Sequence, residues 1–163
     1  MPNHKSITPK IIVIIFGLAL ISFSIFTLTS IQSKPNKPVE NGGHLILDIN
    51  GTKITVEIAK TPAELERGLS GRTSLGEREG MLFYLPERKI ATFWMKDMKF
   101  PIDIIWIDNN TIAYFVENAA IPIGNGIPTY TPDKPATHVL EVNAGFIAEH
   151  NLKIGDELEI PAN

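Results

Sequence analysis

The chain has 163 residues, enough for one domain and an appendage. It contains no cysteine, which excludes disulfides, thiolate nucleophiles, thiolate-held metal clusters and a lipoprotein anchor. From His44 onward, 11 Lys or Arg residues stand against 17 Asp or Glu residues, a net charge of −6. A nucleic-acid-binding surface needs a dense basic patch, so this acidic balance argues against nucleic acid as a partner.

An uncharged apolar stretch runs over the 21 residues from Ile11 to Ile31. A helix of this length spans about 31 Å, which matches a bilayer hydrocarbon core of about 30 Å. The sequence therefore predicts four segments, namely a leader at 1–10, a transmembrane signal-anchor helix at 11–31, a flexible linker at 32–43 and a folded domain at 44–163.

The orientation of the predicted membrane helix is not decided by charge. Lys5 and Lys10 precede it, and Lys34 and Lys37 follow it, so the positive-inside rule is balanced. The short leader favours a single-pass protein of the cytoplasmic membrane with its domain outside the cytoplasm. The alternative is a signal peptide cleaved near residues 22–24, which leaves a secreted domain.

The segment 44–58 is predicted to form a β-hairpin. Apolar residues alternate on both sides of Asn50-Gly51, the preferred two-residue hairpin turn. Such a turn pairs Leu47 with Ile54 and brings the aliphatic side chains to one face.

A short helix is predicted to follow the hairpin. Thr61 has the features of an N-cap, Pro62 those of a first helical residue, and Glu64 completes a capping box. Gly68 and Gly71 are expected to end the helix.

Further strands are expected at 80–85, 92–98, 102–107, 111–117 and 137–142, with a last strand ending at Ile160. A second short helix, capped by Asn143, is expected to run to His150. These elements predict a mainly β (β-rich α+β) fold, a small barrel-like domain with two short helices.

Asp103 stands out because its strand is apolar on both faces, and a buried carboxylate must be paired or hydrogen-bonded. It is either a structural tie to an arginine or to loop amides, or a carboxylate at a cleft mouth that binds a ligand or acts as a base. A two-residue turn at Asn109-Asn110 without a bulge pairs Asp103 with Val116. This register points Asp103 and Glu117 to opposite faces, which argues against an acid/base pair.

Arg67 and Arg72 bracket a Gly-Leu-Ser-Gly segment and are candidates to clamp a carboxylate or phosphate, or to pair with carboxylates of the domain. Trp94, with Lys96 beside it, is a candidate to stack on a sugar or other flat ligand. Met95 and Met98 are expected on opposite faces of a strand, which favours core packing over a copper site. We expect no metal and no cofactor.

Six ordered motifs resemble a known family. They are ERGLSGR at 66–72, EGMLF at 79–83, FWMKD at 93–97, PIDII at 101–105, VEN at 116–118 and LEVNAG at 140–145. They are similar to those of the uncharacterised prokaryotic family known as domain of unknown function 192, with departures at Asp97 and Met98.

The resemblance covers about residues 44 to 160. It implies a compact, β-rich, barrel-like fold, often behind a signal peptide or anchor, with no established activity. The recurrent polar positions of the family fall on Arg67, Arg72, Lys96, Asp103 and Glu117, and none has a catalytic role to transfer.

Three functions remain open. The leading one is a membrane-anchored extracytoplasmic binding module for a small polar or anionic ligand, because no nucleophile, metal site or acid/base pair is found. Its candidate ligand-binding residues are Arg67, Arg72, Trp94, Lys96, Asp103 and Glu117. The alternatives are a cell-envelope hydrolase with Asp103 or Glu117 as general base, and a structural or partner-binding domain without a small-molecule site.

Overall fold

The structure is a computed structural model that describes residues 39–41 and 43–160. The predicted leader at 1–10 and the predicted membrane segment at 11–31 lie outside these residues. Of the helices that are described, none has the length and apolar character needed to cross a bilayer.

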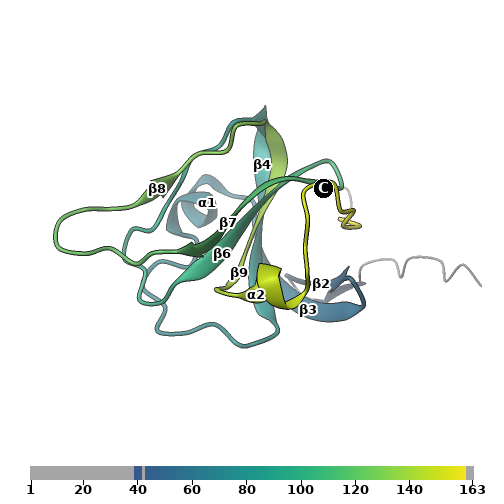
Figure 1. Cartoon of the computed structure of the whole chain (residues 1–163), viewed down its shortest axis with the longest axis horizontal. Helices are drawn as coiled ribbons and strands as arrows, with labels where there is room; N and C mark the ends of the chain where they lie inside the picture. Colours follow the sequence, from purple (N-terminus) through teal and green to yellow (C-terminus); the bar gives the residue numbers. More distant parts are fainter. Residues whose placement is uncertain (1–38, 42, 161–163) are drawn as a thin grey trace, which may run out of the picture. The chain divides into compact units, whose positions relative to one another are not determined.

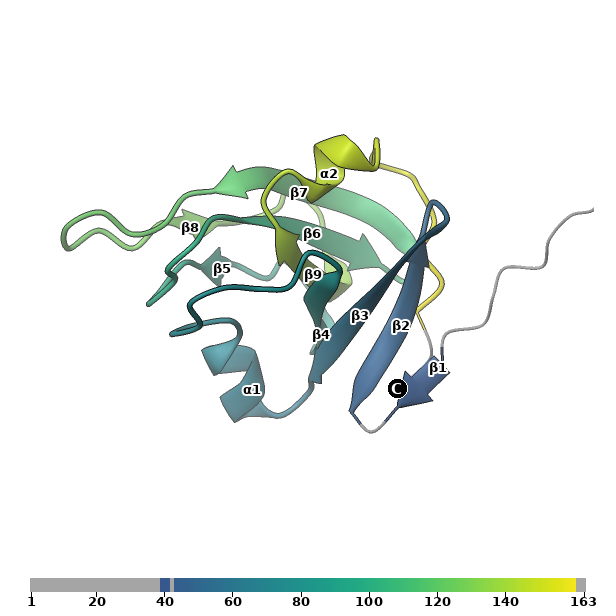
Figure 2. The same ribbon diagram turned by 90° about the horizontal axis from the view of Figure 1, so that it is seen from below.

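The described elements are β1 (Val39–Asn41), β2 (His44–Ile49), β3 (Thr52–Ala59), α1 (Pro62–Arg67), β4 (Glu79–Lys89), β5 (Phe93–Trp94), β6 (Ile102–Asp108), β7 (Thr111–Ala119), β8 (Thr129–Tyr130), β9 (Ala136–Asn143) and α2 (Phe146–Glu149). Seven strands form one sheet in the order β1-β2-β3-β4-β9-β6-β7, and β5 pairs with β8 in a small second sheet (Figures 1 and 2). All pairs are antiparallel except β3 with β4.

The first hairpin and the first helix confirm the sequence prediction. β2 and β3 pair Leu47 with Ile54 around a turn in which Asn50 and Gly51 both have positive φ. In α1, Thr61 is the N-cap of a complete capping box with Glu64. Both elements depend on local backbone chemistry, which a sequence shows directly.

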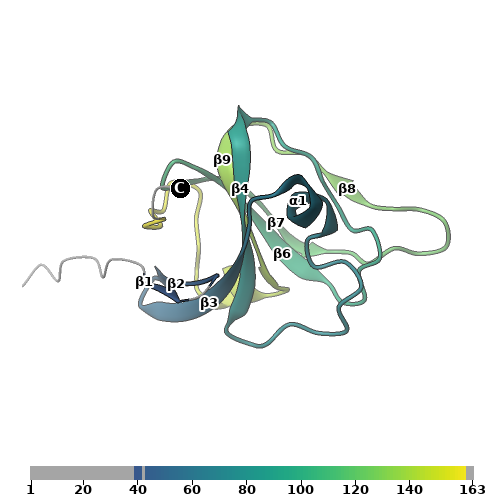
Figure 3. The same ribbon diagram turned by 180° about the vertical axis from the view of Figure 1, so that it is seen from behind.

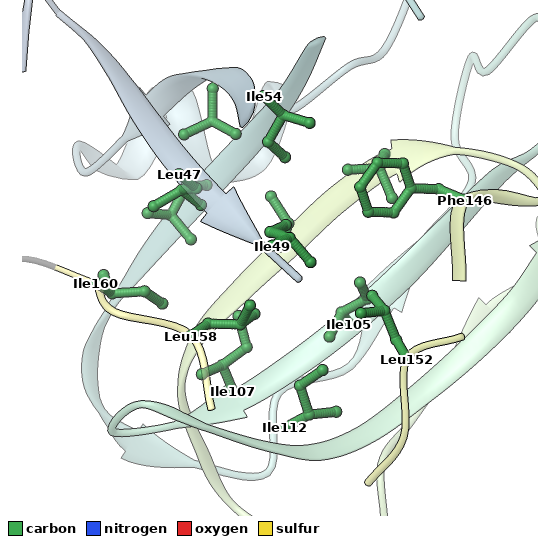
Figure 4. Packing of buried hydrophobic residues seen from close by; sticks show 14 of the residues in the cluster. Leu47, Ile49, Ile54, Ile105, Ile107, Ile112, Phe146, Leu152, Leu158 and Ile160 are labelled. Atoms are coloured by element: carbon green, nitrogen blue, oxygen red, sulfur yellow. The ribbon is translucent and has the colours of Figure 1, made fainter. Parts of the chain in front are cut away.

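The seven-stranded sheet is covered on both faces. On the face that we call the α2 face, α2 and the chain after it pack on the sheet, and on the opposite α1 face lie α1 and the segments with β5 and β8 (Figures 2 and 3). The core of the α2 face is mainly aliphatic (Figure 4) and includes Leu47, Ile49, Ile54, Ile105, Ile107, Ile112, Phe146, Leu152, Leu158 and Ile160.

The β-rich fold with two short helices is confirmed, but the predicted barrel-like closure is wrong for the described residues. The sheet is open, with β1 and β7 as its edges. The segment expected to be the last strand makes one isolated bridge, between Glu157 and Thr111. Leu158 and Ile160 then pack into the aliphatic core with the side chains of β2, so hydrophobic burial covers this side of the sheet without a closing strand.

The predicted register of β6 with β7 is also wrong. Ile104, and not Asp103, lies opposite Val116, because the pairing shifts between Trp106 and Ile107, and it shifts a second time between Ile102 and Ile104. At the second shift Asn118 adopts a positive φ, and its N–H donates to the Asp103 carboxylate. The buried carboxylate therefore stabilises the bulge that turn arithmetic did not foresee.

The segment 92–98 departs from the predicted strand as well. Only Phe93 and Trp94 pair as a strand, and the chain then turns, with the Met98 N–H donating to the Met95 carbonyl at 3.2 Å. Met95 and Met98 are both buried in the core of the α1 face, so the prediction that they lie on opposite faces is wrong.

Candidate functional site

A cleft opens on the α1 face between α1 and the segment that carries β5. We call it the α1–β5 cleft. One part has a volume of about 290 Å³ and is lined by Ala63, Glu66, Arg67, Ser70, Lys96 and Asp97. An adjoining part of about 200 Å³ is lined by Leu65, Glu66, Thr92, Phe93 and Trp94. Glu66 borders both parts, so they form one surface.

Hydrogen bonds hold the two walls of the cleft together. The Ser70 hydroxyl donates to the Lys96 carbonyl at 2.7 Å, and the Gly71 N–H donates to the Asp97 carbonyl at 3.0 Å. Because Gly68 ends α1 about two turns after Thr61 begins it, Glu66 and Arg67 fall on the last turn, at the cleft. The local sequence thus sets which charges reach the mouth.

The mouth of the cleft carries four charged side chains of balanced sign. Glu66 and Asp97 oppose Arg67 and Lys96, and all four are exposed. None of them forms an ion pair with any residue that the structure describes. The Lys96 ammonium lies 5.4 Å from the centroid of the Trp94 ring. The charged groups at the mouth are therefore free to bind a ligand.

Below this mouth, an inner cavity of about 20 Å³ reaches the sheet, and Glu141 lines it. Glu141 lies on β9 between Met81 of β4 and Ile104 of β6, and only 5% of it is exposed. The other lining residues are Leu65, Glu66, Arg67, Gly68, Leu69, Ser70, Phe83, Phe93, Trp94 and Met98. The floor of the cleft thus places the Glu141 carboxyl among apolar side chains and the polar groups of Glu66, Arg67 and Ser70.

Burial raises the pKa of Glu141 to about 8, against the opposing effect of the Arg72 charge. The protonated form therefore predominates at pH 7. No group in the described part of the chain hydrogen-bonds this carboxyl. Gly68 covers it closely, since a Cβ at Gly68 would lie 3.8 Å from Glu141 Oε2 and 3.2 Å from Phe83 Cζ. The carboxyl thus keeps its hydrogen-bonding capacity for an occupant of the inner cavity.

Of the predicted site residues, Arg67, Trp94 and Lys96 meet at the α1–β5 cleft. Arg72 does not line it, because its guanidinium makes a bidentate pair with Glu57, both N···O distances being 2.6 Å. That pair lowers the pKa of Glu57 and raises the pKa of Arg72. Glu117 is exposed on β7, away from the cleft lining.

Asp103 lies on the α2 face, fully buried, and both of its oxygens accept backbone N–H groups. Oδ1 accepts from Asn118 at 2.8 Å and from Gly145 at 3.2 Å, and Oδ2 accepts from Ile147 at 2.9 Å. The tie to loop amides is thus observed. Asp103 takes the capping role predicted for Asn143, whose side-chain amide donates to carbonyls before β4.

The sequence prediction missed Glu141 as a site residue. A signal was present, because Glu141 is a lone carboxylate in an apolar strand segment, the same pattern that singled out Asp103. Nothing local distinguishes a carboxylate that loop amides will bind from one that they will not. As for metals, no group of three or more His, Asp or Glu side chains among the described residues is placed to hold an ion.

Comparison with known proteins places the chain in a family. No match is found among curated proteins. A crystal structure of "a putative transcription regulator" from Sinorhizobium meliloti is 32% identical, with a TM-score of 0.61, and the match covers 71% of this chain and 91% of that one. A protein of unknown function from Novosphingobium aromaticivorans is 30% identical, with a TM-score of 0.63, covering 76% of this chain and 92% of that one. Residues 45–160 match the family model DUF192, described as an uncharacterized ACR. The chain belongs to the family of domain of unknown function 192.

Proposed function

We propose that the chain is a binding module whose α1–β5 cleft takes a small polar or anionic ligand. The observation that carries this proposal is the convergence of Arg67, Lys96 and Trp94 on one hollow whose floor is Glu141, a buried carboxyl without a partner among the described residues. Concave sites that combine apolar walls with a few convergent polar groups are typical of ligand binding. We further propose that residues 11–31 anchor the chain in the cytoplasmic membrane with this domain outside the cytoplasm.

The charges at the mouth support a binding role over a purely structural one. A structural domain gains stability by pairing its charges, as Arg72 does with Glu57 and Arg88 with Asp108. Arg67 and Lys96 make no such pair within the described residues, and, unlike the other unpaired lysines and arginines there, both line the cleft. The hydrolase alternative gains no support, since both oxygens of Asp103 accept amides and Glu117 is exposed at an edge strand.

Tryptophan fluorescence of the full chain in a zwitterionic detergent tests the binding proposal. The chain has two tryptophans, and Trp106 is fully buried whereas Trp94 is 43% exposed, so a ligand in the cleft changes the Trp94 emission. We expect at least one of phosphate, citrate, glutamate and a set of neutral trisaccharides to give a saturable change.

A matched control distinguishes the loss of cleft contacts from a general effect of removing positive charge. The double variant Arg67→Gln/Lys96→Gln is expected to weaken binding at least about tenfold, the equivalent of about 1.4 kcal/mol. Lys153→Gln, an exposed lysine outside the cleft lining, is expected to leave it unchanged. No response to any probe, or equal affinity in the double variant, contradicts the proposal.

A further inference from the structure

The chemistry of the α1–β5 cleft specifies the class of its ligand further. One side is apolar, formed by Leu65, Phe93 and Trp94, and the other is a rim of charged and hydroxyl groups. A ligand that fits both sides needs an apolar surface next to a dense set of polar groups. A pyranose ring has this character, because its C–H groups form apolar patches on the faces of the ring and its hydroxyls project from the rim.

The balanced charge of the rim favours a ligand without net charge. An anion attracted by Arg67 and Lys96 also meets the carboxylates of Glu66 and Asp97. Hydroxyl groups avoid this conflict, because a hydroxyl donates to a carboxylate and accepts from an ammonium or a guanidinium. All four side chains thus contribute favourably to the binding of a neutral polyhydroxyl compound.

The inner cavity restricts the size and the charge of the ligand group that can enter it. Its volume of about 20 Å³ admits one group of the size of a water molecule, which is too small for a phosphate. An ionised ligand group there loses its hydration, and the lining carries both signs of charge, so Glu66 opposes an anion and Arg67 opposes a cation. A hydroxyl satisfies Glu141 in either protonation state, because it both donates and accepts. Leu65, Phe93 and Trp94 line the inner cavity and the outer cleft alike, so one ligand reaches both.

We propose that the α1–β5 cleft binds a neutral carbohydrate, with a sugar ring stacked on Trp94 and one hydroxyl group hydrogen-bonded to Glu141 in the inner cavity. This inference rests on the proposed binding function and narrows its ligand from small polar or anionic compounds to neutral sugars. The exposed Lys96 side chain lies over the Trp94 ring, so a sugar that stacks on this face takes the place of the ammonium, which then donates to a hydroxyl at the rim of the sugar.

Calorimetric titration of the full chain tests the inference, in a zwitterionic detergent because sugar-based detergents compete. The probes are cellotriose, maltotriose and chitotriose, with phosphate and citrate as the anionic arm. We expect saturable binding of at least one trisaccharide, a loss of at least tenfold in affinity for Trp94→Ala, and no binding of the anions.

A pair of substitutions at Glu141 identifies the buried hydrogen bond. Glu141→Met removes the polar group while keeping an apolar side chain of similar length in apolar surroundings, and we expect at least a tenfold loss of affinity. Glu141→Gln keeps a donor and an acceptor, and we expect its affinity to remain within threefold of the wild type. An unchanged affinity in Glu141→Met or in Trp94→Ala overturns the inference.

The trisaccharide and anion probes together distinguish a failure of this inference from a failure of the proposed function. Binding of phosphate or citrate without binding of any trisaccharide overturns the carbohydrate inference and leaves the binding module standing. Absence of binding for sugars and anions alike overturns both. Binding of a trisaccharide that Glu141→Met and Trp94→Ala both weaken supports both.

Discussion

Among the residues whose burial the structure describes, each face of the sheet buries one carboxyl group, and the surroundings of the two groups differ. Asp103 on β6 and Glu141 on β9 lie on neighbouring strands, Asp103 opposite Val142 and Glu141 opposite Ile104. On the α2 face, Asp103 accepts three backbone N–H groups. On the α1 face, Glu141 accepts none from the described residues and borders the inner cavity.

This difference distinguishes a structural carboxylate from a functional candidate. Burial alone does not, since both residues are at most 5% exposed. Asp103 connects a bulge of β7 to the start of α2, and those amides replace the water that its charge has lost. Glu141 accepts no amide from the described residues, and burial raises its pKa to about 8, which makes it a candidate for function.

The largest expected effect is that of Asp103→Asn. The amide keeps one acceptor oxygen but places an NH₂ group against a backbone donor, so a buried N–H loses its partner. We expect a loss of about 4 kcal/mol in the free energy of unfolding, and a fall in melting temperature of roughly 10–15 °C. Thermal unfolding measures this. Asp133→Asn, at an exposed aspartate, is the control, and equal behaviour of the two variants contradicts the structural role of Asp103.

Glu141→Gln is expected to gain stability relative to the wild type as the pH rises. The pKa of Glu141 is raised from 4.5 to about 8 on folding, so its contribution to stability is fully present below pH 4.5 and is lost as pH rises to about 8. Wild-type stability therefore falls by up to about 1.4 kcal/mol per pH unit from this group, and the variant lacks that slope. Chemical denaturation from pH 5 to 8.5 measures it, with Glu117→Gln as the exposed control.

The direction in which the relative stability changes with pH is the most direct test of that prediction. The stability of Glu141→Gln relative to wild type should increase between pH 5 and pH 8. If the free energy of unfolding changes with pH in the same way for the wild type and for Glu141→Gln, the pKa of Glu141 is not raised by folding. This result contradicts the difference between Asp103 and Glu141.

Gly68→Ala tests the cover over Glu141. Gly68 has φ +49° and ψ −133°, a conformation open mainly to glycine, and a Cβ there meets Phe83 Cζ at 3.2 Å. We expect a loss of about 2 kcal/mol, from strain and from displacement of the Phe83 ring. Gly71→Ala is the matched control, because Gly71 also has positive φ but nothing within 4 Å, and should lose about 1 kcal/mol. Equal losses contradict close packing at Gly68.

The smallest expected effect is that of Arg72→Lys. Lysine cannot reproduce the bidentate pair with Glu57, and the pair is about one-third exposed, so we expect a loss of about 1 kcal/mol or less in the free energy of unfolding.

Arg72→Gln removes the charge and is expected to raise the pKa of Glu141 further, because the Arg72 charge opposes that rise. Carboxyl NMR titration measures this shift, and an unchanged Glu141 pKa rules out the electrostatic link.

Short-range features could be predicted from the sequence because they depend on neighbouring residues. The Asn50-Gly51 turn set the hairpin register, and the Thr61-Pro62-Glu64 cap set the start of α1. The register of β6 and β7 could not be predicted in this way. The pairing shifts once between Trp106 and Ile107 and again beside Asn118, and this second bulge is bonded to Asp103, a contact made across the hairpin.

The sequence by itself determined the family, the β-rich composition of the fold and the candidates Arg67, Trp94 and Lys96, because motifs and local patterns carry this information. Only the tertiary structure decided that the sheet stays open, that Asp103 is tied to loop amides and that Glu141 lies at the floor of the cleft. The physical reason is that the state of a buried carboxyl depends on which distant backbone groups reach it. Gly145 and Ile147 lie more than forty residues from Asp103 in the chain, and their approach is set by packing of the whole sheet.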